Sequence, residues 1–133
     1  MDLINRNILV ISPQTWSDFF TSKQHYSIEL SKRKNNVFYL TPPNREVDSV
    51  LIHPSNIDGL KIVRLPFKRW MVLRFHNRFL YDLLMKRYIV NVVKKLAIQF
   101  DIVWSFEFQL YANLDWFKAD YNIYHPVDMV KTD

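Results

Sequence analysis

Three side chains near the C-terminal half of the sequence have the types and positions needed for chemistry. His125 stands at the end of the predicted strand 121–125 and precedes Pro126, which favours an extended backbone. Its imidazole, with an ordinary pKa of ~6.5, can donate a hydrogen bond to an oxyanion at neutral pH. Asp128 can orient that ring or bind hydroxyl groups, and Glu107, directly after the segment 101–106, can bind a hydroxyl in the same way. The alternative for all three is an ordinary polar position in a surface loop.

A second candidate group stands at the expected start of a helix. Thr21 and Ser22 offer N-cap hydroxyls, and the first turn then carries polar side chains. Free backbone N–H groups and the positive end of the helix dipole can bind a phosphate or an acceptor oxygen there. This predicts substrate binding by Ser22, Lys23, Gln24 and His25. Alternatively, they are first-turn residues whose tips face water.

Alternating strand and helix patterns must position these groups. Apolar, β-branched segments predict strands at 7–12, 37–40, 60–65, 101–106 and 121–125. Helices are expected from Ser22 to a stop at Asn35 and Asn36, within 68–99, and at 110–119, whereas 44–59 reads as irregular. The prediction is one α/β domain over residues 1–133, a Rossmann-like open, mostly parallel sheet with helices on both faces. In such sheets ligands bind beyond the carboxyl ends of the strands, which selects the loops 12–22, 41–46, 105–110 and 125–133.

The segment 68–99 is long for one helix, so we expect a break near Asn77–Asp82. An apolar stripe at helical spacing should face the core, and it consists of Met85, Ile89, Val92 and Leu96. A charged stripe in the same segment, in which Asp82 can pair with cations on either side, consists of Arg74, Arg78, Asp82 and Lys86.

Composition excludes several classes of function. The sequence holds a single glycine, Gly59, so it has neither a phosphate-binding P-loop nor a glycine-rich dinucleotide motif. It holds no cysteine, which excludes disulfides, thiolate metal sites and cysteine nucleophiles. Residues 1–7 lack the apolar core of a signal peptide, and no apolar run approaches the roughly 20 residues of a bilayer span. We therefore expect a cytoplasmic protein.

Positive charge is concentrated between Lys61 and Lys95, where ten Lys and Arg residues accompany one acid, Asp82. Aromatic residues are interleaved with these cations, a combination that favours an anionic partner. The predicted contacts to an anionic membrane surface are Arg64, Lys68, Arg69, Trp70, Arg74 and Arg78. Nucleic acid is the less favoured partner, and the alternative is a helix with a solvated charged face.

Four segments together resemble the N-terminal domain of GT-B glycosyltransferases of the retaining, group 1 type. They are NILVISPQTW (7–16), HYSIELSKRKNNVFYLTPP (25–43), DIVWSFEFQLYANL (101–114) and YNIYHPVDMV (121–130). Their order and spacing carry the resemblance, which extends over most of the chain outside 44–100.

The resemblance implies a glycosyltransferase that uses a nucleotide-sugar donor, without a further cofactor or an essential metal, in polysaccharide or glycolipid synthesis. It implies that His125 contacts the sugar or acceptor and takes part in catalysis. The acceptor would be a saccharide or a lipid-linked saccharide, which is consistent with peripheral membrane association. A second, donor-binding domain would complete the enzyme, so this chain alone is expected to be inactive. The competing hypothesis is a non-catalytic α/β module whose basic, aromatic helix binds a membrane surface or nucleic acid.

Overall fold

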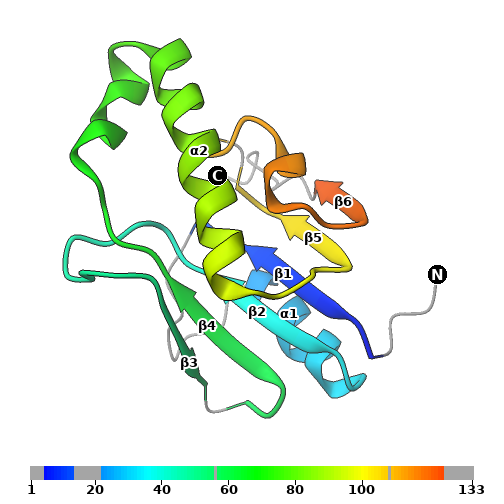
Figure 1. The fold of residues 1–133 in the computed structure, drawn as a ribbon. Helices are drawn as coiled ribbons and strands as arrows, with labels where there is room; N and C mark the ends of the chain where they lie inside the picture. The colour runs from blue at the N-terminus through cyan, green and yellow to red at the C-terminus, as the bar shows by residue number, and fades with distance from the viewer. Residues whose placement is uncertain (1–4, 14–21, 56, 108, 125–133) are drawn as a thin grey trace, which may run out of the picture.

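The computed structural model describes residues 5–13, 22–55, 57–107 and 109–124, and within them a six-stranded sheet organises the chain (Figure 1). The strands are β1 (Asn7–Ile11), β2 (Asn36–Leu40), β3 (Leu51–Pro54), β4 (Leu60–Arg64), β5 (Ile102–Ser105) and β6 (Tyr121–Tyr124). Their spatial order is β3-β4-β2-β1-β5-β6, and every neighbouring pair is parallel except β3 with β4. The predicted open, mostly parallel α/β sheet is confirmed.

Both faces of the sheet are buried. Alternate residues of the central strands point to opposite sides, so each central strand contributes side chains to two apolar clusters. Leu9 and Ile11 of β1 join one apolar cluster, whereas Ile8 and Val10 join the other. The helix α2 (Arg78–Leu96) covers the first face, and α1 (Ser22–Lys32) supplies Leu30 to the second. The near-continuous apolar sequence of the strands predicted a sheet with helices on both faces, and this prediction is confirmed.

The region predicted as one helical segment, 68–99, divides in two. A 3-10 helix, η1 (Arg69–Phe75), comes first, and α2 starts at Arg78 after Asn77, whose side-chain oxygen accepts a hydrogen bond from the backbone N–H of Leu80 at 3.1 Å. The predicted break is thus confirmed, and its cause is an N-cap. Ala97, in the left-handed conformation, ends α2.

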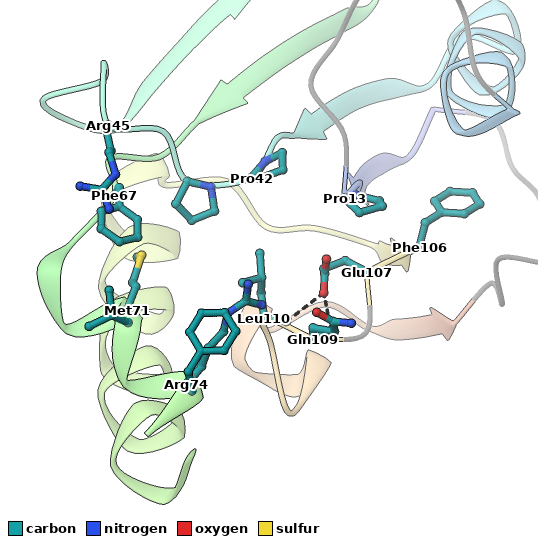
Figure 2. Close-up of a pocket in the computed structure, with 13 residues that line it drawn as sticks. Pro13, Pro42, Arg45, Phe67, Met71, Arg74, Phe106, Glu107, Gln109 and Leu110 are labelled. Carbon is teal, nitrogen blue, oxygen red and sulfur yellow. Dashed lines mark hydrogen bonds between the residues drawn. The ribbon is translucent and has the colours of Figure 1, made fainter. Parts of the chain in front are cut away.

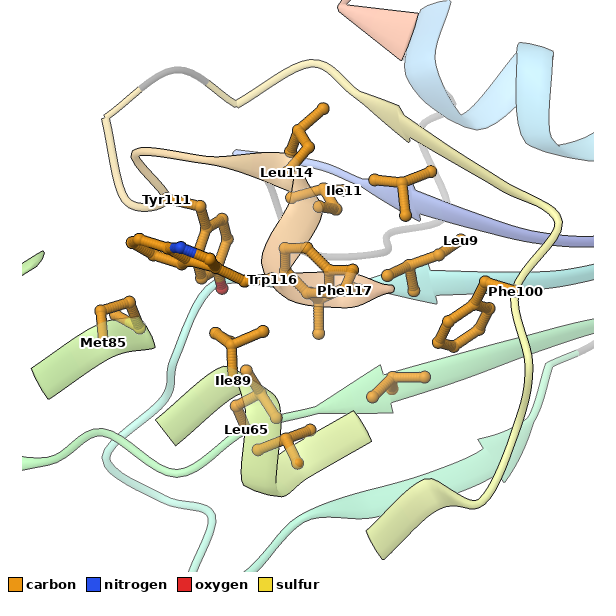
Figure 3. Packing of buried hydrophobic residues seen from close by; sticks show 14 of the residues in the cluster. Leu9, Ile11, Leu65, Met85, Ile89, Phe100, Tyr111, Leu114, Trp116 and Phe117 are labelled. Atoms are coloured by element: carbon orange, nitrogen blue, oxygen red, sulfur yellow. The ribbon is translucent and has the colours of Figure 1, made fainter. Parts of the chain in front are cut away.

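The predicted core stripe of α2 is confirmed. Met85, Ile89 and Val92 are buried, and Leu96 packs against the same cluster. Figure 3 shows Met85 and Ile89 in this cluster together with aromatic side chains from the segment 111–117. In the charged stripe, Arg78 pairs with Asp82 at 2.9 Å, the one ion pair between described residues.

The turn from α1 to β2 differs from the prediction. Lys34, with φ of 65°, takes the left-handed position that was assigned to Asn35 and Asn36. Asn35 is instead buried, where it accepts a hydrogen bond from the Arg6 backbone N–H at 3.0 Å and donates one to the Leu30 carbonyl at 2.9 Å. An amide that supplies both a donor and an acceptor is more useful in that buried place than in the exposed turn.

Two other expectations were wrong. The segment 44–59 contains the edge strand β3, in which Leu51 and Ile52 are exposed, so its residues carry no burial pattern that the sequence could show. The segment 110–119 is helical only in the 3-10 turn η2 (Leu114–Phe117). The Asn113 side chain caps this turn by accepting a hydrogen bond from the Asp115 backbone N–H, and Lys118, in the left-handed conformation, ends it. A local cap and a left-handed stop so close together leave room for one turn.

Candidate functional site

The order of the strands fixes where a ligand can bind. From β1 the chain moves outward through β2 and β4, and it then returns to the other side of β1 with β5 and β6. The order therefore reverses between β1 and β5, because the strand that follows β1 in the sequence lies on one side of this pair and the strand that follows β5 lies on the other. This is the position at which open α/β sheets leave a crevice.

A cleft of about 630 Å³ lies at this edge of the sheet (Figure 2). Its described walls come from the connections after β1, β2, β4 and β5 and from η1. The lining residues are Pro13, Pro42, Pro43, Arg45, Phe67, Met71, Val72, Arg74, Phe75, Phe106, Glu107, Gln109 and Leu110. Its size is that of a small-molecule site, and its lining is apolar with a few charged groups, as such sites usually are.

Two guanidinium groups stand on the wall of the cleft opposite β5. Arg45 holds its Cζ atom 4.3 Å from the centre of the Phe67 ring, and Arg74 holds its Cζ atom 4.5 Å from the centre of the Phe75 ring. Neither is in an ion pair with another described residue. Stacking on an aromatic ring orients a guanidinium while its N–H groups stay available to a ligand. Such groups suit phosphate or carboxylate oxygens, which they can bind through two parallel hydrogen bonds.

Glu107 faces the cleft from the end of β5, as the sequence predicted for the sheet edge. Its side chain is largely buried, and one carboxylate oxygen accepts hydrogen bonds from the backbone N–H groups of Gln109 and Leu110, the latter at 2.9 Å. Its backbone N–H also donates to the Ser105 hydroxyl at 3.1 Å, and that hydroxyl lies 2.9 Å from the Glu107 carbonyl. These contacts hold the carboxylate in place as a hydrogen-bond acceptor, the role that binding of a ligand hydroxyl requires.

Buried tyrosines support the rim of the cleft. Tyr81 donates a hydrogen bond from its hydroxyl to the Leu110 carbonyl at 2.8 Å, which ties α2 to the turn that holds Glu107. Burial raises the pKa of the Tyr81 phenol to about 12 against the smaller opposing effect of nearby arginines. Burial likewise raises the pKa of Tyr39. Its hydroxyl donates a hydrogen bond to the Ser12 hydroxyl at 2.8 Å, which lowers the pKa by less than burial raises it. Both phenols are therefore neutral supports at physiological pH.

Of the other predicted substrate-binding and catalytic residues, two lie outside the described part of the chain and four have no described side chain. His125 and Asp128 follow β6 in the sequence but are outside the described residues. Ser22, Lys23, Gln24 and His25 form the start of α1, and nothing of their side chains is described. Their predicted roles remain predictions.

The predicted membrane-contact residues lie on or beside three elements, β4, η1 and α2. Arg64 donates a hydrogen bond from Nε to Nε2 of His53 at 2.9 Å, on the β3–β4 pair. Trp70 is half-buried, with its ring 6.0 Å from that of Tyr81 and 5.8 Å from that of Tyr88. The remaining four lie on or beside η1 and at the start of α2, and they are Lys68, Arg69, Arg74 and Arg78.

Sequence reasoning missed the two cleft arginines as a pair. Arg45 lies in the loop 41–46, which was predicted to matter, but nothing in that loop singled it out. Arg74 was assigned only to the membrane surface and to the charged stripe of the helix. Their proximity to one cleft depends on η1 folding back over the carboxyl edge, which no local pattern encodes.

Among the described residues, no three His, Asp or Glu side chains converge as a metal site would require. None of the helices described is long and apolar enough to cross a bilayer.

Comparisons with known proteins give little that bears on the chemistry of the cleft. No protein-family model matches the chain, and no curated protein matches it. A solved structure described as trehalose-6-phosphate from E. coli bound with UDP-2-fluoro glucose aligns with 78% of this chain, with a TM-score of 0.49 and 11% sequence identity. The chain spans 28% of the length of that structure.

Proposed function

We propose that the chain is the acceptor-side lobe of a glycosyltransferase that uses a nucleotide-sugar donor, acting in polysaccharide or glycolipid synthesis. The observation that supports this most is the cleft at the β1–β5 switch point, with two guanidinium groups on one wall and the oriented Glu107 carboxylate on the other. The four sequence segments that resemble GT-B enzymes contain the strands β1, β2, β5 and β6, and this adds support.

The reaction would break the bond between the sugar's anomeric carbon and a diphosphate oxygen, and it would form a bond from that carbon to the oxygen of an acceptor hydroxyl, whose proton passes to the departing diphosphate or to solvent. Negative charge grows on the departing diphosphate, so the transition state is stabilised by positioned cationic donors. Arg45 and Arg74 are suited to that role or to holding a phosphate of the acceptor. Glu107 would accept a hydrogen bond from a sugar hydroxyl and so fix the orientation of the ring.

His125 would complete the site in this proposal by donating a hydrogen bond to an oxygen that gains charge. A second lobe would bring most of the contacts to the nucleotide, so the lobe described here would bind ligand without turning it over. The expected property of the chain alone is therefore binding, and binding is what should be tested.

The test is a titration of the full chain with UDP-glucose and, separately, with UDP, followed by backbone amide chemical shifts. We expect shifts in the connections around Arg45, Arg74 and Glu107, and at least a tenfold weaker affinity for an Arg45→Gln/Arg74→Gln variant, because each charge-assisted hydrogen bond contributes about 1.5–3 kcal/mol. The matched control is Lys94→Gln/Lys95→Gln, which removes the same charge at the far end of α2. Shifts confined to that far end, or equal losses in both variants, would contradict the proposal.

A further inference from the structure

An apolar patch covers the end of the hairpin that η1 and the first turns of α2 form. Its exposed side chains, which we call the η1–α2 tip, are Val72, Phe75, Phe79, Leu80 and Leu83. Phe75 and Phe79 are 72% and 79% exposed, so both rings present most of their surface to solvent, and Arg74 holds its Cζ atom 4.5 Å from the centre of the Phe75 ring. Figure 1 shows this end of α2 projecting beyond the sheet. Several exposed apolar side chains on adjoining helices of a small domain point to an interaction site.

The charges on the two helices that carry the tip are mostly positive. From Gly59 to Tyr81 the sequence holds no acid, and Asp82, the next one, is already paired with Arg78 at 2.9 Å. Arg69, Arg74 and Arg78 lie on the two helices that carry the tip. The surface thus combines exposed rings with an excess of cations, because Asp82 pairs with one of these three arginines and Glu107, which lines the same cleft as Arg74, is in no ion pair with it.

This combination separates the possible occupants. In a two-fold interface with a second copy, the same arginines would face one another, which like charges disfavour. Nucleic acid would use the cations and stack on the rings but would leave Leu80, Leu83 and Val72 in water. An anionic bilayer satisfies both features, because apolar side chains enter the boundary of the acyl chains while arginines contact the headgroup phosphates.

We propose that the η1–α2 tip is a docking surface for an anionic lipid bilayer, with Phe75 and Phe79 as the inserted side chains and Arg74 and Arg78 at the phosphates. Trp70, which the sequence suggested as the aromatic contact, packs against Tyr81 and Tyr88 inside the protein, so the insertion falls to these two phenylalanines. The proposal does not depend on glycosyl transfer.

Docking at the tip would also orient the cleft. Val72, Arg74 and Phe75 belong both to the exposed hairpin and to the lining of the cleft. A bilayer seated on the tip therefore lies at the mouth of the cleft, and the headgroup of a membrane lipid comes within reach of Arg74. The cleft would then be open to a membrane-borne ligand without that ligand leaving the bilayer.

The experiment measures co-sedimentation of the full chain with two kinds of vesicle, one of equal amounts of phosphatidylglycerol and phosphatidylcholine and one of phosphatidylcholine alone. We expect the chain to bind the vesicles that contain phosphatidylglycerol at low salt and to bind them more weakly in molar salt, where the screening length falls to about 3 Å. We expect little binding to phosphatidylcholine alone. Phe75→Ser/Phe79→Ser should weaken binding to the anionic vesicles by at least tenfold. Since both rings are exposed, this variant should fold, which a thermal melt checks.

Matched controls distinguish docking through the η1–α2 tip from binding through the positive charge of the whole protein. Leu51→Ser/Ile52→Ser changes two exposed apolar side chains on β3 and should bind like the unaltered protein. Arg74→Gln/Arg78→Gln should lose roughly fivefold per arginine. Compared at physiological salt, Lys94→Gln/Lys95→Gln should lose much less, because the 19 residues of α2 extend about 28 Å, several screening lengths under that condition.

Three results would overturn the proposal. The first is no binding of the unaltered chain to the anionic vesicles at low salt. The second is equal losses for the Arg74/Arg78 and Lys94/Lys95 variants, or unchanged binding after Phe75→Ser/Phe79→Ser. The third is a dimer or an RNA complex that the phenylalanine substitutions abolish while vesicles do not bind, which would assign the tip to a different occupant.

Discussion

Substitution of Glu107 separates its structural role from its proposed binding role. One oxygen of its carboxylate holds the backbone N–H groups of Gln109 and Leu110, and the turn they form carries part of the cleft wall. Glu107→Gln keeps an oxygen that can accept both bonds, whereas Glu107→Ala removes it. Both variants therefore lose the negative charge, but only Glu107→Ala also loses the hydrogen bonds that hold the turn.

The magnitudes follow from these contacts. A hydrogen bond to a charged acceptor contributes about 1.5–3 kcal/mol. Gln109 is exposed and Leu110 half-buried, so water replaces part of the loss, and we expect Glu107→Ala to cost about 1.5–3 kcal/mol in total. Glu107→Gln should cost less than about 1 kcal/mol, because a neutral acceptor remains. For a domain of this size, 1 kcal/mol shifts the melting temperature by about 4 °C.

Thermal denaturation of the two variants measures the structural part, and the UDP-glucose titration measures the other. We expect a fall in melting temperature of about 6–12 °C for Glu107→Ala and less than about 4 °C for Glu107→Gln. Both should bind the ligand more weakly. The reasoning is refuted if the two variants lose equal stability, and the binding role is refuted if Glu107→Gln binds as well as the unaltered protein.

Three further outcomes test the fold. Burial raises the pKa of Tyr88 to about 12 from 10.0, so the folded state keeps a proton that the unfolded state releases; this stabilisation is complete below pH 10 and disappears as the pH rises towards 12. Tyr88→Phe should flatten the fall in unfolding free energy over that window, while Tyr121→Phe at an exposed position should not, as urea titrations at stepped pH would show. Asn77→Ala removes the N-cap of α2 and should cost about 0.5–2 kcal/mol in urea denaturation, with Asn77→Ser nearly neutral. Gly59→Ala places a Cβ atom 3.2 Å from the Asn35 carbonyl oxygen at a φ of 79°, and calorimetry should show a loss of about 1 kcal/mol or more; an unchanged melting temperature would mean that the turn adjusts freely.

The sequence revealed those parts of the fold in which burial and local chemistry agree. The strands at Ile8–Ile11 and Val37–Leu40 are apolar throughout because both faces of the sheet are covered, and this signal survives without any tertiary information. The strand β3 gave no such signal, because its exposed residues are held by pairing with β4 rather than by burial. Lys34 was missed as the left-handed residue because Asn35, the better candidate by propensity, has a buried role.

The candidate site was predictable in its position but not in its membership. The sheet order placed it at the carboxyl ends of β1 and β5, and Glu107 was found from its place after a strand. Arg45 and Arg74 come from segments that are far apart in the sequence, and their convergence depends on the path of η1 across the sheet edge. No residue type or spacing near either arginine predicts the path of η1, so the sequence alone could not predict that the two arginines converge.

The helix η1 explains how one short segment serves the core, the cleft and the exposed tip at once. Met71 is buried in the core and Trp70 packs against Tyr81 and Tyr88, and these contacts fix the position of the helix. A 3-10 helix has about 3 residues per turn, so neighbouring residues point in well-separated directions, and Met71 can be buried in the core while Val72 is exposed at the cleft. The cleft wall therefore depends on core packing, whereas the tip does not. Substitution of Trp70 should change both ligand binding and stability, while substitution of Phe75 should leave stability nearly unchanged.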